Sequence, residues 1–136
     1  MADFVGVDEF ASSLGGIIEE SFKRSEAATR RAVKRGASVA KREVIENASN
    51  LPLRNMAGST MIKYVTGFTY RTKAGDGTVE AVIGNENAPG LVHLLEKGHA
   101  KVGGGRVQGY EHVKPAADEA FDKTFEFVQD EIGSAL

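Results

Sequence analysis

The chain has 136 residues, of which 41% are hydrophobic and 26% charged, a composition typical of one soluble globular domain. It contains no cysteine, which excludes disulfide bonds, thiolate metal sites and a cysteine nucleophile. No apolar run is long enough to cross a bilayer, and the acidic start MADFVGVDEF lacks the regions of a signal peptide. We therefore expect synthesis in a cytoplasm and no membrane partner.

The formal net charge of −2 hides an asymmetry along the chain. Eight basic residues against three acidic ones give residues 21–50 a charge of +5. Seven acidic residues against two lysines give residues 111–131 a charge of −5. Opposite charges in two segments favour a surface that contacts a partner, either a protein or a nucleic acid.

A helix is predicted from Asp8 to about Asn47, with an apolar stripe at three-to-four spacing over residues 10–22. The stripe continues as one small residue in every four (Ala28, Ala32, Gly36 and Ala40), which favours close packing against a sheet or another helix. The basic residues share the opposite face, over an arc of roughly 140°. Unbroken, this helix would be roughly 60 Å long. We therefore expect a break or bend at Gly15-Gly16 or Gly36, or an arm projecting over residues 1–15.

The middle of the chain is expected to be a loop followed by an antiparallel sheet. Residues 47–58 are polar and contain a proline, as is typical of a loop. Ile62, Tyr64, Phe68 and Tyr70 alternate with polar residues, which predicts a half-buried strand over 62–71. Asp76-Gly77 predicts a hairpin turn, and residues 78–85 its return strand.

The last third is expected to contain two helices joined by a mobile loop. Residues 91–98 predict a short helix that Gly98 ends, and 115–132 predict a final helix with Phe121, Phe125, Val128 and Ile132 as its apolar stripe. Glycines and a lack of periodicity predict a mobile interaction loop over 99–110, whose candidate contact residues are Lys101, Gly103, Gly104, Gly105 and Arg106. Together these elements predict a single α+β domain over residues 1–136.

No constellation of residues indicates catalysis or a cofactor. His93, Glu96 and His99 come at three-residue intervals, but Gly98 is expected to end the helix before His99, and the spacing of a zinc protease is absent. The glycine triplet lacks the lysine and hydroxyl of a phosphate-binding loop. No serine has the surroundings of a nucleophile elbow. We expect no catalytic residue, no metal and no cofactor, and hence a protein that is not an enzyme.

The basic face of the first helix has three interpretations. It could be a solvated surface, or it could contact the backbone of a nucleic acid over residues 23–42. It could also contact an acidic surface of a neighbour, for which an identical copy offers its last helix. On this third interpretation the candidate interface residues are Arg31, Lys34, Arg35 and Arg42 on one copy, and Asp118, Asp122 and Glu126 on the next.

Residues 79–125 resemble the tail-completion proteins (neck, or head–tail joining proteins) of long-tailed double-stranded DNA bacteriophages, the gene-product-ten-like family. The motifs that carry the resemblance are Val82-Ile83-Gly84, the Leu-Leu-Glu-x-Gly of Leu94 to Gly98, the variable loop, and Pro115-Ala116 at the start of the last helix. One departure is EHVKPA, where the family often has an aromatic residue and a proline.

The resemblance implies a structural virion protein without catalytic residues. Such proteins form a homo-oligomeric ring, with a hexamer favoured over a dodecamer, at the head–tail junction. The implied partners are the stopper or connector, the tail terminator or tail tube, and genomic DNA that passes through the lumen without sequence recognition. The protein would be made in the cytoplasm of the bacterial host and would end in the virion.

Overall fold

The computed structural model describes the backbone of residues 7–52 and 58–135, and the side chains of these ranges from Lys23 onward. The elements in chain order are α1 (Val7–Ser49), α2 (Gly58–Thr66), β1 (Phe68–Gly75), β2 (Thr78–Asn85), α3 (Pro89–Lys97), β3 (Gly98–Ala100), β4 (Arg106–Gln108) and α4 (Val113–Ala135). The predicted α+β class is confirmed: a long first helix, a small antiparallel sheet, a short helix and a final helix are all present.

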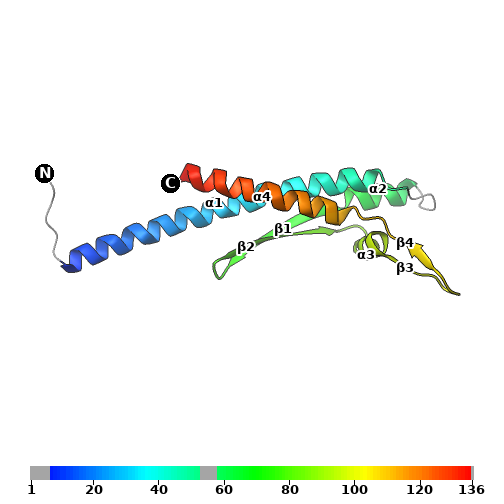
Figure 1. Cartoon of the computed structure of the whole chain (residues 1–136), viewed down its shortest axis with the longest axis horizontal. Coiled ribbons are helices and arrows are strands. Elements are labelled where there is room, and N and C mark those ends of the chain that lie inside the picture. Colours follow the sequence, from blue (N-terminus) through cyan, green and yellow to red (C-terminus); the bar gives the residue numbers. More distant parts are fainter. Residues whose placement is uncertain (1–6, 53–57, 136) are drawn as a thin grey trace.

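Helix α1 is one continuous helix of 43 residues, so neither Gly15-Gly16 nor Gly36 breaks it. At about 1.5 Å per residue it is roughly 65 Å long. Its N-terminal turns run past the end of α4 and past the hairpin (Figure 1). Residues 7–15 of the predicted arm are the first turns of this helix, and residues 1–6 lie outside the described part of the chain.

The first and last helices pack side by side (Figure 1). The small-residue stripe of α1 lies in this interface as predicted, with Ala28 and Ala32 fully buried and Ala40 nearly so. A Cβ added to Gly36 would stand 1.7 Å from the Thr124 hydroxyl oxygen of α4, which shows how closely the two backbones approach.

Only part of the predicted apolar stripe of α4 is covered, since Val128 and Ile132 are half-buried but the two phenylalanines are not. Phe121 and Phe125 are 74% and 64% exposed, whereas Ala116 and Ala120 are buried. A helix that lies against alanines and a glycine must itself present small side chains there, because large ones would hold the two axes apart. Phe121 and Phe125 therefore point away from α1.

Residues 58–66 form helix α2, so the strand predicted over 62–71 is wrong for residues 62–66 and right from Phe68 onward. The alternation of Ile62 and Tyr64 was misleading, because Tyr64 and Phe68 are four residues apart and pack together, with ring centroids 5.0 Å apart. Ile62 is 65% exposed. Gly67 ends the helix against Asn85 and leaves no room for a side chain, since a Cβ there would stand 2.4 Å from the Asn85 amide oxygen.

Strands β1 and β2 form the predicted hairpin, from Phe68 paired with Asn85 to Gly75 paired with Thr78. Asp76 and Gly77 have φ of 51° and 76°, the left-handed values that a tight hairpin turn requires. One face of the hairpin lies on α1, where the Ser38 hydroxyl donates to the Tyr70 hydroxyl at 3.3 Å. The other face, which includes Arg71 and Val82, is exposed.

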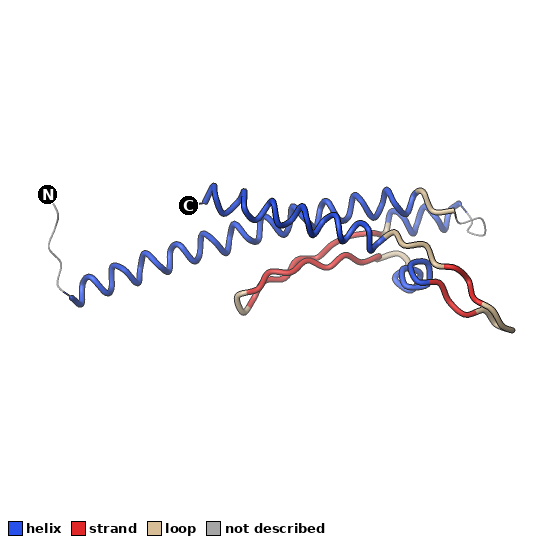
Figure 2. The backbone as a smooth tube through the Cα atoms, in the orientation of Figure 1, coloured by secondary structure: helices blue, strands red, loops and turns tan. Residues whose placement is uncertain are grey.

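A second, shorter hairpin occupies most of the segment for which an irregular loop was predicted. Strands β3 and β4 pair Gly98 with Gln108 and Ala100 with Arg106. The glycines at its tip, residues 103–105, all have positive φ. The hairpin extends away from the helices, next to α3 (Figure 2).

The main core lies under the C-terminal half of α1. It consists of Val44 and Ala48 of α1, Tyr64 of α2, Phe68 of β1 and Ala116 of α4. Partly buried residues of α3 pack around it. In the described ranges, no helix is long and apolar enough to cross a membrane.

Candidate functional site

A basic trough runs along the exposed side of α1, between the β1–β2 hairpin and the end of α4. Three adjoining hollows of about 370, 430 and 340 Å³ form it, and they share lining residues. Its cations are Arg30, Arg31, Lys34, Arg35, Lys41 and Arg42 of α1 and Lys73 of β1. Tyr70, Ile45 and Val79 add apolar surface, and Glu131 is the one carboxylate among the described lining residues.

Several of these guanidinium groups already have carboxylate partners in the same chain. Arg31 donates to Glu131 at 3.0 Å, and Arg35 donates to both Asp130 and Glu131 at 3.2 Å. The hydrogen bond from Arg31 lowers the pKa of the Glu131 carboxyl. Arg35 also lies over the Phe127 ring, 4.1 Å from its centroid.

Two further ion pairs lie within α1. Arg30 pairs with Glu26 at 2.7 Å, and Arg42 contacts Glu43 at 3.5 Å. The seven cations of the trough and the four carboxylates paired with them leave a net charge of about +3. The net positive charge of the trough is therefore much smaller than the number of its basic residues suggests.

The predicted interface residues are all found on the surface. Arg31, Lys34, Arg35 and Arg42 line the basic trough, and Asp118, Asp122 and Glu126 are exposed on α4. The structure also shows what the sequence did not: Arg31 and Arg35 have acidic partners near the C-terminal end of their own chain. Whether the basic face also meets a neighbouring copy stays a prediction.

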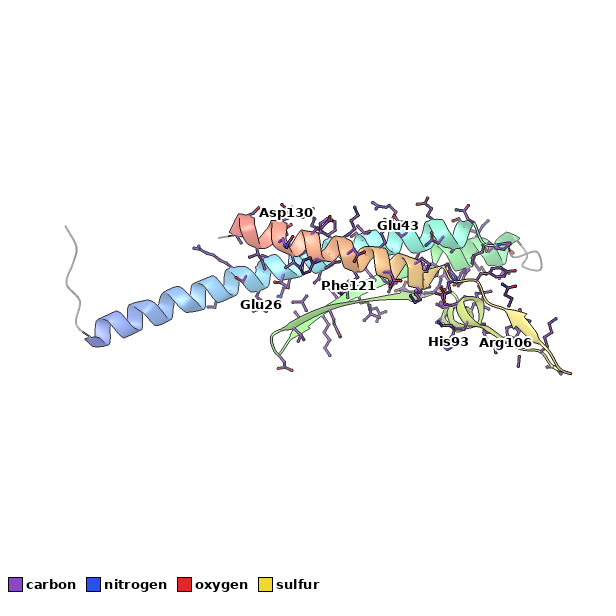
Figure 3. The ribbon with its side chains drawn as sticks, viewed as in Figure 1. Glu26, Glu43, His93, Arg106, Phe121 and Asp130 are labelled. Carbon is purple, nitrogen blue, oxygen red and sulfur yellow. The ribbon has the colours of Figure 1, made fainter. Side chains whose placement is uncertain are left out.

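Helix α4 has an acidic–apolar face, formed by Phe121 and Phe125 together with Asp118, Asp122 and Glu126. These residues are three or four positions apart, so they are neighbours on the helix surface. Phe121 and Asp130 project from opposite sides of α4 (Figure 3), as a separation of nine residues, about two and a half turns, requires. The apolar part of the face therefore points away from the trough of the same chain.

The predicted interaction residues Lys101, Gly103, Gly104, Gly105 and Arg106 lie at the tip of the β3–β4 hairpin and are all exposed. Val102 beside them is also fully exposed. The Lys101 backbone N–H donates to the Gly105 carbonyl oxygen at 3.0 Å, which closes the turn. The Arg106 guanidinium donates to the carbonyl oxygen of Lys97 at 2.9 Å and so ties the hairpin to the end of α3 (Figure 3).

A buried polar network connects α2, α3 and α4, and sequence reasoning missed it. The Glu96 carboxylate accepts the backbone N–H groups of His112, Val113 and Lys114 at 2.8–2.9 Å, so it caps the start of α4. Burial alone would raise the pKa of Glu96, but these N–H groups and His112 together hold it below its ordinary value. An anion at a helix N-terminus is favoured by the backbone dipoles.

His112 completes this network. Its Nδ1 donates to the carbonyl oxygen of Tyr110 at 2.7 Å, and its Nε2 lies 2.5 Å from the Tyr64 hydroxyl. Burial raises the pKa of the Tyr64 phenol well above its ordinary range, so the phenol keeps its proton and donates to Nε2. The side chains of Tyr64 and His112 are fully buried, which makes this network part of the core.

The histidines show no arrangement that would bind a metal. His93 and His99 are exposed, and His112 is enclosed by Tyr64 and Glu96. Among the side chains described, those of residues 23–52 and 58–135, no three His, Cys, Asp or Glu are grouped closely enough to bind an ion.

Comparison with protein-family models, with curated proteins and with solved structures finds no significant match. The features that bear on function are therefore the basic trough, the acidic–apolar face of α4 and the tip of the β3–β4 hairpin.

Proposed function

We propose that this chain is a structural subunit of a bacteriophage neck, which joins the DNA-filled head to the tail as a homo-oligomeric ring. The observation that carries the proposal is that one chain has two exposed surfaces of complementary character, the basic trough and the acidic–apolar face of α4. A closed ring needs two different patches on each subunit, each complementary to the other.

The motifs that resemble the neck family support the proposal because one interaction connects them. Leu94, Leu95 and Glu96 belong to α3, and Glu96 caps the helix that contains Pro115 and Ala116. The Leu-Leu-Glu-x-Gly motif thus has a physical role, which is to hold the start of α4 against α3. Val82 and Ile83 lie on β2, where Ile83 packs against the same core and Val82 is exposed.

The implied setting is the head–tail junction of a virion assembled in a bacterial cytoplasm. There the ring, most simply a hexamer, would meet a stopper or connector on one side and a tail terminator or tail tube on the other. DNA would pass through the lumen without sequence recognition. We expect no catalytic activity, because the exposed surfaces offer charge and apolar area without a positioned nucleophile or base.

The test is deletion of the gene in the virus or prophage that encodes it, followed by electron microscopy and mass spectrometry of the particles. We expect DNA-filled heads and finished tails that stay separate, and restoration of joined particles by the gene supplied in trans. Normal joined particles after deletion would overturn the proposal, as would absence of the protein from complete virions.

Nucleic-acid binding by residues 23–42 remains the second candidate, and the observation that favours it is the row of cations along the basic trough. Binding to phosphates would weaken steeply with salt, by a slope that counts the cations engaged. Electrophoretic mobility shifts with duplex DNA at several salt concentrations test this candidate. Tight binding at physiological salt that Lys34→Glu abolishes would favour it over ring assembly.

A further inference from the structure

We infer that the acidic–apolar face of α4 in one copy docks into the basic trough of a second copy, in a head-to-tail contact. The inference deepens the proposed function by naming the surfaces of the ring contact. It can be tested on the purified chain, whether or not that chain belongs to a virion.

The first step concerns the apolar residues. Phe121 and Phe125 are one turn apart on α4 and 74% and 64% exposed. Two adjacent phenylalanines on one helix face make a contiguous apolar patch, and such patches mark contact sites. The patch cannot be covered by α1 of the same chain, because α1 packs on the side of α4 that contains Ala116 and Ala120.

The second step concerns charge. Asp118 and Asp122 lie three residues before Phe121 and Phe125, and Glu126 follows directly, so a docking partner must offer cations beside apolar surface. The basic trough has this combination, with Lys34, Lys41 and Lys73 next to Tyr70, Ile45 and Val79. Neither Lys34 nor Lys73 is within ion-pair distance of a described carboxylate.

The third step excludes a contact within one chain. The trough lies on the side of α4 where Asp130 meets Arg35, and Phe121 projects from the opposite side (Figure 3). A copy cannot place its own Phe121 and Phe125 in its own trough, but it can place them in the trough of a neighbour. The contact uses a different patch on each partner, so it leaves one of each free and can propagate into a ring.

The fourth step favours protein over nucleic acid as the occupant. Four of the seven trough cations already pair with carboxylates of the same chain, so a phosphate backbone would have to displace those partners. Asp118 of the docking helix already pairs with Lys114 at 3.0 Å, so that helix needs only the modest positive charge that remains, together with the apolar lining. Charge then sets the orientation of the contact, while the phenylalanines supply most of the affinity.

The test uses two broken variants and measures association by sedimentation velocity. Lys34→Glu with Lys73→Glu disables the trough without touching Arg31 and Arg35, which hold α4 in the same chain. Phe121→Ala with Phe125→Ala disables the face, and the exposure of both rings leaves folding intact. Each double variant should associate at least about tenfold more weakly than the native chain. The matched controls Lys63→Glu and Ile62→Ala, both exposed on α2, should associate like the native chain.

Mixing the two variants is the decisive measurement. The trough-deficient copy keeps its face and the face-deficient copy keeps its trough, so the mixture should form a 1:1 dimer that grows no further. A mixture that stays monomeric overturns the inference, as does a native chain that never self-associates. Undiminished association of either double variant also overturns it, and loss of DNA binding alone in the trough variant assigns the trough to nucleic acid.

Discussion

Glu96 shows how a single side chain can join three elements. It belongs to α3, yet its carboxylate is bonded to the first backbone N–H groups of α4, and His112 beside it reaches Tyr64 of α2. The other members of this network are Tyr64, His112, Val113 and Lys114. They lie up to 50 residues apart in the sequence, so the network forms only in the folded chain. The network stabilises the fold because each buried polar group left without a hydrogen bond would lower the free energy of unfolding by about 1–3 kcal/mol.

Replacing Glu96 with Gln should destabilise the protein by about 1–3 kcal/mol at pH 7. The amide keeps one acceptor oxygen but turns a donor toward one of the three backbone N–H groups. Because the pKa of Glu96 is lowered in the folded protein, its contribution is present above the ordinary carboxyl pKa of about 4.3 and is lost as the pH falls below it. Urea unfolding at pH 7, 5 and 3 should show that the difference in the free energy of unfolding between native protein and variant becomes smaller at pH 3.

Glu119→Gln is the control for this prediction, since Glu119 is exposed on α4. It should change the free energy of unfolding by less than about 0.5 kcal/mol. A gap for Glu96→Gln that is the same at pH 3 as at pH 7 would show that the carboxylate charge does not matter.

At the scale of elements, the contact between α1 and α4 organises the molecule. Its closeness depends on Gly36, which faces Thr124 across the interface. The same closeness explains why small residues, Ala116 and Ala120, occupy the most closely packed part of α4, while Phe121 and Phe125 lie on its outer face. The exposure of Phe121 and Phe125 on the proposed docking face therefore follows from how the helices pack.

Gly36→Ala should destabilise the protein by about 1–3 kcal/mol, although alanine is the better helix former. The added methyl group would meet both the Cβ and the hydroxyl oxygen of Thr124, so one helix must shift. Thermal unfolding measures the effect, and adding Thr124→Ala should recover part of the loss. Gly133→Ala, which has open space around it on α4, should be neutral or stabilising. A stabilised Gly36→Ala protein would contradict the close packing.

Arg35→Ala should loosen the last turns of α4 with little effect on overall stability. The change removes two ion pairs and the stacking on Phe127, and such surface interactions contribute little to overall stability. Amide hydrogen exchange over residues 127–135 should become faster, while exchange around Tyr64 stays unchanged. Arg71→Ala, on the outer face of the β1–β2 hairpin, is the control and should alter neither region.

Local patterns in the sequence predicted those elements that local chemistry determines. Asp76-Gly77 fixed the β1–β2 turn, Gly98 ended α3, and the small-residue stripe predicted a close helix contact. The errors came from long-range effects. Tyr64 follows both a strand and a helix pattern, and only its packing on Phe68 and His112 decides between them.

The candidate site was predicted in part for the same reason. The basic and acidic residues could be assigned to helix faces from their spacing alone. The partners of Arg31 and Arg35 could not, because they lie about 100 residues away in the sequence and depend on the register of α4 against α1. The exposure of Phe121 and Phe125 likewise depends on which side of α4 packs against α1.

At the scale of the whole molecule, the proposed function makes the β3–β4 hairpin, which extends away from the helices, the element best placed to meet a neighbouring ring. Three residue pairs hold the two strands together. The three glycines at its tip face open space, with nothing within 4 Å of the position where a Cβ would lie. We predict fast amide exchange at residues 101–105 in the free protein and slow exchange in assembled particles. The measurement is hydrogen exchange with mass spectrometry on both samples. Strong protection in the free protein, or equal exchange in the two samples, would contradict this role.

The pairing of the first helix with the last has a consequence for how the chain is made. A ribosome completes α1 long before α4, and α2, the hairpins and α3 emerge between them. During that time Ala28, Ala32 and Gly36 have no helix to cover them. Folding must then bring together two helices that lie far apart in the sequence, and contacts of such long range slow folding. A nascent chain cut before α4 would leave Ala28, Ala32 and Gly36 uncovered.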